Sequence, residues 1–168
     1  MPQATREQQD HFKVITSMAG FAPSLADNLR IYEIDDIPPE DEKGWRMVDG
    51  WKIVFEGVVG KDWTNPLGNM HGAAYAWVFD SCTSAALIGI HTPTFWGPPM
   101  LSGISLSMEL QYLNPAPMGT RVLIEVEIVK CSPRLANLRC EVKDMKTGKI
   151  YGTGTHLKLW KAPSEGKL

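Results

Sequence analysis

Four successive segments in the second half of the chain alternate apolar and polar residues. The alternation runs through 104–113, 121–130, 135–145 and 150–160, and short polar or Pro-containing links separate the segments. A period of two residues is typical of strands that bury one face. Strands joined by short links pair antiparallel, so we predict an antiparallel sheet from this half of the chain.

The first of these segments shows the alternation most regularly. We predict that its apolar residues share one face of the strand and that its polar residues, beginning with Ser105, share the other. The apolar set is Ile104, Leu106, Met108, Leu110 and Tyr112. On this pattern alone, an exposed serine without a function explains Ser105 as well as a functional one.

The first part of the chain predicts one helix and a few strands. Residues 5–19 place apolar side chains at three- and four-residue spacing, which is typical of an amphipathic helix. Residues 29–35 alternate and predict a half-buried strand. Residues 44–59 predict a short strand before Asp49-Gly50 and a longer one after it, because Asp-Gly is a common hairpin turn.

A long apolar segment, 71–89, lies between these strands and the four later ones. It is too long for an ordinary strand, so we predict a helix that buries its faces against the sheet. The order of elements indicates an α+β fold. We expect an N-terminal helical segment at 1–24, a single domain at 25–162 and a polar tail at 163–168.

Composition narrows the possible functions. The chain has 168 residues, and its formal net charge of −2 argues against nucleic acid as a partner. Three cysteines form no CxxC pattern and four histidines lack metal-ligand spacing, so we expect free thiols and no metal. No apolar segment approaches the ~20 residues of a membrane span. No signal-peptide pattern is evident, so we expect a cytoplasmic protein, with a mitochondrial or peroxisomal location also open.

Two residues of the apolar helix suggest chemistry. Asp80 is its one charged residue, and a carboxylate in an apolar cleft can act as a general base or a nucleophile. The alternative is an aspartate that faces solvent. Gly72 follows His71 where the helix begins, and the unpaired amides of a helix start can stabilise an oxyanion. By position alone, a glycine that only eases the turn is the more common case.

The spacing of Gly72 and Asp80 sets a geometric condition. Eight residues separate them, which is about 12 Å along a helix at ~1.5 Å per residue. The two groups of one chain therefore cannot act on the same atom. If both are catalytic, the helix of a second copy must lie antiparallel beside the first, so the spacing predicts a two-fold dimer with two shared sites.

The residues around the start of this helix resemble a known family signature. The matching residues are 65–73 (NPLGNMHGA), followed by Asp80, and they are similar to the HGG-type signature of the hotdog-fold acyl-CoA thioesterases. The branch with the phenylacetic-acid-degradation thioesterases and the mammalian thioesterase-superfamily acyl-CoA hydrolases is the most similar. The resemblance covers about residues 45–160 and includes 103–105 and 112–116.

This resemblance implies both a fold and an activity. The fold is the hotdog: a long central helix wrapped by a five- or six-stranded antiparallel sheet, in homodimers that often pair again into tetramers. The activity is hydrolysis of an acyl-CoA thioester to a free acid and CoA. Coenzyme A is part of the substrate, and the resemblance implies no separate cofactor.

The resemblance also implies roles for individual residues. The Gly72 amide would hold the thioester carbonyl oxygen, and Asp80 of the other subunit would activate water or attack directly. Asn65 would position the water or the thioester, and Ser105 would assist the water near Asp80. His71 would help to shape the loop.

Four further residues, and a weaker fifth, are candidates for binding the substrate. Lys130 and Arg134 would contact the phosphates or ribose of CoA, with Lys158 as a weaker choice, and Ala136 ends the matching turn. Trp77 would line an acyl or aryl pocket. Each lysine or arginine is equally explained as an ordinary surface charge.

Two other functions stay open at this stage. One is a hotdog dehydratase or hydratase, which needs an Asp and a His acting together. The other is a protein that binds acyl-CoA or acyl carrier without catalysis. The chain also departs from the family pattern, because Ala73 stands where the second glycine of the signature is expected.

Overall fold

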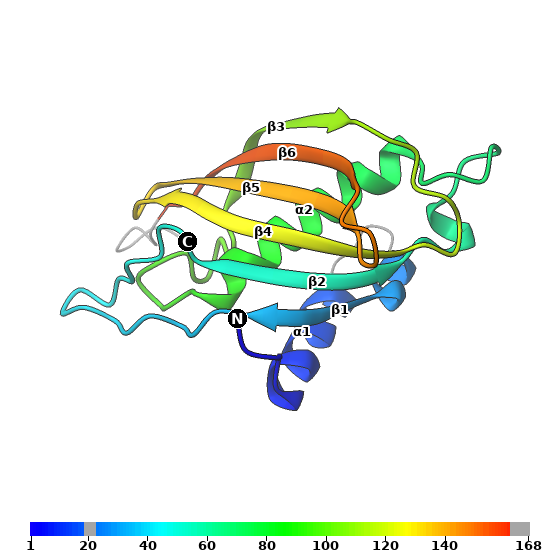
Figure 1. The fold of residues 1–168 in the computed structure, drawn as a ribbon. Coiled ribbons are helices and arrows are strands. Elements are labelled where there is room, and N and C mark those ends of the chain that lie inside the picture. Colours follow the sequence, from blue (N-terminus) through cyan, green and yellow to red (C-terminus); the bar gives the residue numbers. More distant parts are fainter. Residues whose placement is uncertain (19–22, 162–168) are drawn as a thin grey trace.

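A six-stranded antiparallel sheet curves around the long helix α2, Gly72–Gly89, in the computed structural model (Figure 1). The strands are β1 Leu29–Ile34, β2 Lys52–Val58, β3 Ile104–Tyr112, β4 Arg121–Cys131, β5 Leu135–Asp144 and β6 Ile150–Leu159. Their order in the sheet is β1-β2-β4-β5-β6-β3. This architecture confirms the predicted hotdog arrangement. The structure describes residues 1–18 and 23–161, so the predicted polar tail lies outside the described residues.

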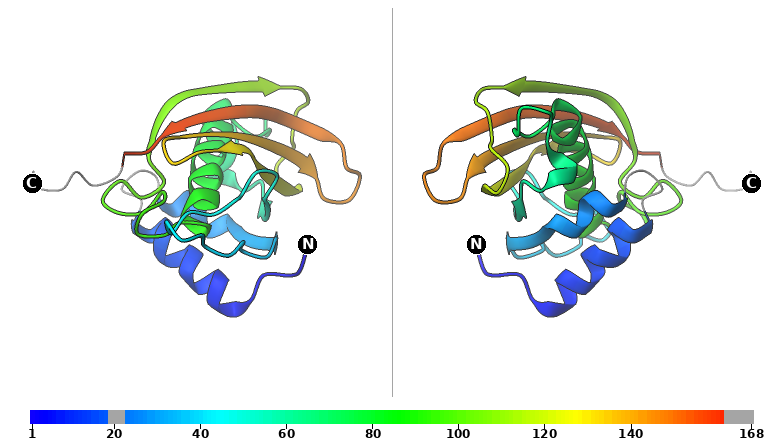
Figure 2. Two further views of the ribbon diagram at one scale, coloured as in Figure 1. Left: turned by 90° about the vertical axis from the view of Figure 1, so that its left-hand side faces the viewer. Right: turned by 90° about the vertical axis from the view of Figure 1, so that its right-hand side faces the viewer.

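Three shorter helical elements complete the fold. They are α1 Arg6–Met18 and the two 3₁₀ helices η1 Pro23–Asn28 and η2 Lys61–Trp63. Figure 2 shows α1 crossing near the C-terminal end of α2, beside β1. The Gln9 side chain accepts a hydrogen bond from the Ile31 amide at 3.0 Å, and the rings of Phe12 and Phe55 lie 5.1 Å apart. These contacts attach α1 to the sheet.

The helix α2 packs closely on the sheet because β6 has glycines where the two meet. A Cβ atom on Gly154 would lie 2.8 Å from a ring carbon of Phe79 and 2.3 Å from the Glu109 carbonyl oxygen. A side chain at this position would therefore force the helix away from the sheet. The buried core is formed by residues of both the sheet and α2, and the α2 residues include Val78, Phe79 and Leu87.

The segment before Asp49-Gly50 does not form the predicted strand. It contributes one isolated bridge, between Glu40 and Arg46, and β2 begins only at Lys52. The turn is attached to β4 instead of closing a hairpin, because the Gly50 amide donates to the Ile128 carbonyl at 2.7 Å. The Asp49 carboxylate also accepts a hydrogen bond from the Cys131 amide at 2.8 Å. The hairpin prediction at this turn was wrong.

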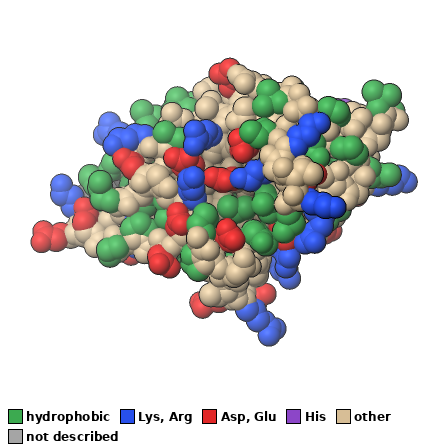
Figure 3. Space-filling view, viewed as in Figure 1, with side chains coloured by type: hydrophobic (Ala, Val, Ile, Leu, Met, Phe, Trp, Pro, Cys, Tyr) green, Lys and Arg blue, Asp and Glu red, His purple; other side chains and the backbone are tan. Residues whose placement is uncertain are grey.

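The outer face of the sheet carries paired charges (Figure 3). Lys52 of β2 lies 2.9 Å from Glu125 of β4, and Lys143 of β5 contacts the same carboxylate at 2.8 Å. Arg139 pairs with Glu127 at 2.6 Å. Opposite charges on neighbouring strands stabilise their pairing, and they make this face polar. The apolar core and the candidate site lie on the other face, toward α2.

Candidate active site

Asp80 lies halfway along α2, on a stripe that the sheet leaves uncovered. Its side chain is 53% exposed. Ala76 and Ser84 lie four residues before and after Asp80, and Ala73 lies seven before it, so these exposed or half-buried residues share its face of the helix. This face therefore combines small side chains with one carboxylate.

Three polar side chains surround the carboxylate of Asp80. The distances from Asp80 Oδ1 are 3.4 Å to Ser105 Oγ, 3.8 Å to His156 Nε2 and 3.9 Å to Lys158 Nζ. Ser105 lies on β3, and the other two lie on the neighbouring strand β6. The structure thus brings Ser105 to Asp80, as the site prediction required.

An irregularity in β3 aims Ser105 at the helix. Ser105 pairs with Lys158 and Ser107 pairs with Leu157, so Leu106 is an extra residue with no partner of its own. This β-bulge shifts the alternation by one position and puts Ser105 on the same face as Met108. The prediction of strict alternation, with Ser105 opposite the apolar residues, was wrong for this reason.

The sequence did not lead us to expect His156 and Lys158 as partners of Asp80. Both point inward from β6, where His156 is 1% and Lys158 3% exposed. The signal was present in the sequence, because both stand an even number of residues before the buried Trp160. The burial of Lys158 beneath α2 also removes it from the surface, where a contact with CoA phosphates was suggested.

A hydrogen-bond chain fixes the protonation of His156. Thr83 Oγ1 donates its one proton to the Phe79 carbonyl at 2.6 Å, so it accepts from His156 Nδ1 at 2.7 Å. Burial, together with the nearby Lys158, lowers the pKa of His156 to about 4, although Asp80 opposes this. The imidazole is therefore neutral at pH 7. Its Nε2 accepts a hydrogen bond from the Ser105 hydroxyl at 2.8 Å.

This arrangement leaves the carboxylate of Asp80 available. The single hydroxyl proton of Ser105 goes to the shorter contact with His156, so Ser105 does not donate it to Asp80. Lys158 donates to Ser84 Oγ at 2.7 Å and is the positive charge nearest Asp80 in the described residues. Burial lowers the pKa of Lys158, and the charge of Asp80 opposes that change. An ionised Asp80 in this position can accept a proton from water.

The buried histidine gives a testable pH dependence of stability. The folded pKa of about 4 lies below the 6.5 of an ordinary histidine, so the unfolded chain binds the proton first. The contribution of neutral His156 is complete above pH 6.5 and is lost as the pH falls toward 4. We expect wild type to lose up to about 3 kcal/mol relative to a His156→Gln variant over this range. Urea unfolding of both proteins at several pH values measures it, and a constant difference would contradict it.

The N-terminus of α2 is capped by His71. Its Nδ1 accepts a hydrogen bond from the Ala73 amide at 2.9 Å, so the proton of a neutral His71 is on Nε2. In the described part of the chain, the Gly72 amide is paired with no acceptor. Tyr112 Oη lies 3.4 Å from the Gly72 carbonyl oxygen, so this tyrosine, which the sequence analysis did not assign to the site, stands beside the free amide.

The loop before α2 is held by Asn65. Its Oδ1 accepts the amides of Leu67 at 2.9 Å and Asn69 at 3.2 Å. The Met70 and His71 amides donate to Ala116 and Trp63. The side-chain oxygen of Asn65 is therefore used to shape the loop, which leaves its NH₂ group as the donor for any substrate contact.

The candidate substrate-binding residues lie in different surroundings. Lys130 is 74% exposed and forms an ion pair with Asp49 at 2.6 Å, and Arg134 is exposed in the turn between β4 and β5. Ala136 is fully buried, and Trp77 is 8% exposed within the core. Ser105, Lys158, Ala136 and Cys131 form one cross-strand row, so the turn with Arg134 lies about 14 Å from Ser105 at ~4.8 Å per strand.

The described residues contain neither a metal-binding cluster nor a membrane span. No group of three or more His, Cys, Asp or Glu side chains in them is arranged to hold a metal ion. None of the described helices has the length and apolarity needed to cross a membrane.

The fold and the carboxylate on its central helix define a hotdog-fold domain of thioesterase type. The family model of the thioesterase superfamily matches residues 67–151, and the chain belongs to this family. Acyl-coenzyme A thioesterase 13 of Mus musculus is 33% identical over 107 residues, which are 64% of this chain and 71% of the relative. The Homo sapiens protein of that name is 30% identical over 107 residues, with the same shares of the two chains.

Solved structures agree with this assignment. Thioesterase superfamily member 2 from Mus musculus superimposes with a TM-score of 0.68 at 26% identity, over 95% of this chain and 98% of the other. A hypothetical thioesterase from Streptococcus pneumoniae, solved with coenzyme A, gives 0.62 at 18% identity, over 96% of this chain and 100% of the other. The second comparison supports the fold alone.

Proposed function

We propose that this protein hydrolyses acyl-CoA thioesters to a free acid and CoA, in sites shared between two copies of the chain. The observation that carries the proposal is the half-exposed carboxylate of Asp80 on the uncovered stripe of α2, with the free amide of Gly72 on the same helix. The two lie about 12 Å apart at ~1.5 Å per residue, so an antiparallel second helix supplies the missing half. Family membership and the acyl-CoA thioesterases among the relatives support the chemistry.

The exposed edge of the sheet supports a dimer. β3 is the last strand of the described sheet, and Ile104, Leu106 and Tyr112 on it are 50%, 49% and 57% exposed. An unpaired strand edge with apolar side chains is a template for another strand. Pairing of β3 with its symmetry mate would bring the uncovered stripes of two α2 helices together, and small residues on them permit close approach. We propose that such dimers can pair again into tetramers.

The reaction uses the two halves of each site in sequence. The Gly72 amide of one subunit donates to the thioester carbonyl oxygen and stabilises the oxyanion of the tetrahedral intermediate. Asp80 of the other subunit takes a proton from water, whose oxygen bonds to the carbonyl carbon. Collapse breaks the carbon–sulfur bond, and the proton goes from Asp80 to the CoA thiolate. Direct attack by Asp80 through an acyl anhydride remains the alternative route.

The other site residues take supporting roles in this proposal. Ser105 accepts a hydrogen bond from the water beside Asp80, because its hydroxyl proton is donated to His156 Nε2 at 2.8 Å. The Lys158 ammonium lies 3.9 Å from Asp80 Oδ1 and attracts its negative charge. The Asn65 NH₂ group contacts the thioester or the water. Lys130 and Arg134 bind the phosphates of CoA at the surface.

The close approach of His156 to Asp80 gives one reason to test a dehydratase as well. Such an enzyme needs an Asp and a His that both contact the substrate. His156 is 1% exposed and bonded on both ring nitrogens, so it has no free atom for a substrate. This favours hydrolysis. Thiol release from a panel of short, long and aromatic acyl-CoAs tests the proposal, and the absence of thiol with every substrate would overturn it.

Subunit mixing provides a test of the shared site. We expect an Asp80→Asn variant and a Gly72→Pro variant, each inactive alone, to recover activity when mixed. Random exchange makes half of the dimers mixed, and each mixed dimer has one intact site, so the expected level is about a quarter of wild type. Exchange is verified by native mass spectrometry of differently tagged chains. Complete exchange without recovery would show that each site lies within one chain.

A further inference from the structure

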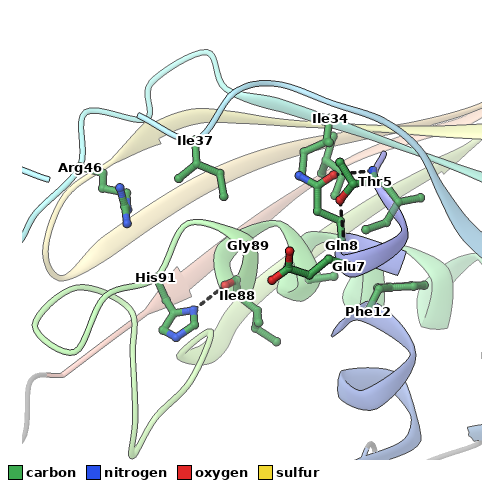
Figure 4. Close-up of a pocket in the computed structure, with 13 residues that line it drawn as sticks. Thr5, Glu7, Gln8, Phe12, Ile34, Ile37, Arg46, Ile88, Gly89 and His91 are labelled. Atoms are coloured by element: carbon green, nitrogen blue, oxygen red, sulfur yellow. Dashed lines mark hydrogen bonds between the residues drawn. The ribbon is translucent and has the colours of Figure 1, made fainter. Parts of the chain in front are cut away.

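A second feature of the structure is a cavity of about 480 Å³ at the C-terminal end of α2 (Figure 4). Its volume lies in the range of small-molecule pockets in proteins. Its apolar wall includes Phe12 of α1, Ile34 of β1, Ile53 of β2 and Ile88 of α2. In Figure 4, α1 and the loop with Ile37 cover it from opposite sides. The apolar part of this lining suits a hydrocarbon group.

Most of this cavity is built by parts of the chain that precede the matched family segment. Nine of its thirteen lining residues lie between Thr5 and Ile53, whereas the family model begins at residue 67. The remaining four are Ala85, Ile88, Gly89 and His91. The cavity is therefore built mostly outside the segment that the family model matches, where α1 covers the end of the central helix.

The central helix connects the cavity to the carboxylate. Asp80, Ser84 and Ile88 follow one another at intervals of four residues, so they lie along one side of α2. The eight residues from Asp80 to Ile88 span about 12 Å at ~1.5 Å per residue. On this side of α2, the side chains between Asp80 and Ile88 are all small: Ser81, Ser84 and Ala85. An extended acyl chain whose thioester is held at Asp80 must span about this distance to reach Ile88.

We propose that the cavity receives the far end of a long linear acyl chain whose thioester is held at Asp80. This inference rests on the proposed acyl-CoA hydrolysis and adds the substrate class to it: acyl chains long enough to span the distance from Asp80 to Ile88. Acetyl and other short acyl groups do not reach the cavity. The aliphatic wall, dominated by isoleucine, matches an alkyl chain.

Polar groups at the rim set the limit of the chain. The Arg46 guanidinium donates a hydrogen bond to the Glu40 carboxylate at 2.8 Å. His91 Nδ1 donates a hydrogen bond to the Ile88 carbonyl oxygen at 2.6 Å. The Glu7 side chain projects from α1 toward the end of α2 at Gly89 (Figure 4). Burying a methyl end against these charged groups is unfavourable, so chains longer than the apolar wall gain nothing further.

Gly89 lines the cavity and has room for a Cβ atom, so it is a suitable position for a substitution that reduces the cavity. A Cβ atom there would meet only a Trp51 ring carbon, at 3.5 Å, which is an ordinary contact. Gly89→Leu therefore places a branched side chain among the lining residues, while Gly89→Ala adds one methyl group and is the matched control. Ile37→Glu is a second, independent variant, because Ile37 is 44% exposed and tolerates a charge.

The experiment measures kcat/KM against acyl-CoA chain length for wild type and the three variants, after thermal unfolding has shown that each is folded. For wild type, kcat/KM is expected to rise about fourfold for each methylene that enters the cavity, since burial of one CH₂ is worth ~0.8 kcal/mol. Gly89→Leu and Ile37→Glu are expected to remove this rise and to leave acetyl-CoA hydrolysis unchanged. Equal chain-length profiles in wild type and both variants would overturn the proposal.

A binding measurement separates this inference from the proposed function. A fluorescent long-chain fatty acid is titrated into wild type and Gly89→Leu. If wild type releases no thiol from any acyl-CoA, hydrolysis is refuted, but the cavity is still supported when the probe binds wild type at least tenfold more tightly than Gly89→Leu. Equal affinities, or binding to neither protein, would refute the cavity as a chain-binding site.

Discussion

Replacing Asp80 by asparagine is expected to lower kcat for acyl-CoA hydrolysis by about 10²–10⁴-fold, the usual range for loss of a general base. The amide keeps the size of the side chain but cannot take a proton from water. The Asp80 side chain is 53% exposed, so the fold should survive the change. Steady-state thiol release with the best substrate of wild type gives the measurement, and full activity in a folded Asp80→Asn protein would refute the assigned role.

The buried ammonium of Lys158 requires a control for this variant. Asp80→Asn leaves Lys158 without the carboxylate that lies 3.9 Å away, and an unpaired buried charge is unfavourable. An additional Lys158→Met substitution removes that charge. The double variant should therefore recover stability and remain inactive. If it instead recovers activity, the loss in Asp80→Asn came from structural disturbance and not from the missing base.

Replacing Gly72 by proline is expected to lower kcat by about 10²–10³-fold, as for removal of one oxyanion donor. Proline has no amide hydrogen, so this change deletes the proposed donor and little else. The position tolerates it: Gly72 is the first residue of α2, where proline is favoured, and His71 before it has φ −72° and ψ 144°. Thiol-release kinetics and thermal unfolding of the same preparation test both statements.

Gly72→Ala is the matched control for the proline variant. A Cβ atom at this position would lie 3.4 Å from Tyr112 Oη, an ordinary contact, so both substitutions fit the protein. Alanine keeps the amide hydrogen, and its effect on kcat therefore measures only the space taken by the methyl group. Equal losses in the two variants would assign the role of Gly72 to that space and not to its amide.

The helix and the later strands were predictable because each follows from a local pattern. The predicted strand 104–113 is Ile104–Tyr112, and the predicted helix 71–89 is Gly72–Gly89. A period of two or an apolar segment of this length has few alternatives. The hairpin at Asp49-Gly50 was not predictable in the same way, because distant residues of β4 hold that turn.

The candidate site also combines residues that a local sequence pattern indicates with residues that distant segments bring together. Asp80 and Gly72 were found from a short motif and from helix spacing, both of which are contiguous in sequence. The side chains around Asp80 come from β3 and β6. Ser105 and His156, which form a hydrogen bond there, are 51 residues apart in the sequence. The even spacing of His156 and Lys158 from Trp160 indicates the face of the strand on which they lie, but which residue of the helix they contact depends on the tertiary structure. His156 and Lys158 were therefore missed as partners of Asp80.

The sequence by itself determined the helix, the strands and the separation of Gly72 from Asp80, because backbone periodicity and rise per residue are local properties. Only the tertiary structure decided which face Ser105 occupies, since the bulge at Leu106 depends on the register between β3 and β6. It also decided the neutral state of His156 and the cavity beneath α1. Both depend on burial by segments far away in the chain, and burial has no local signature.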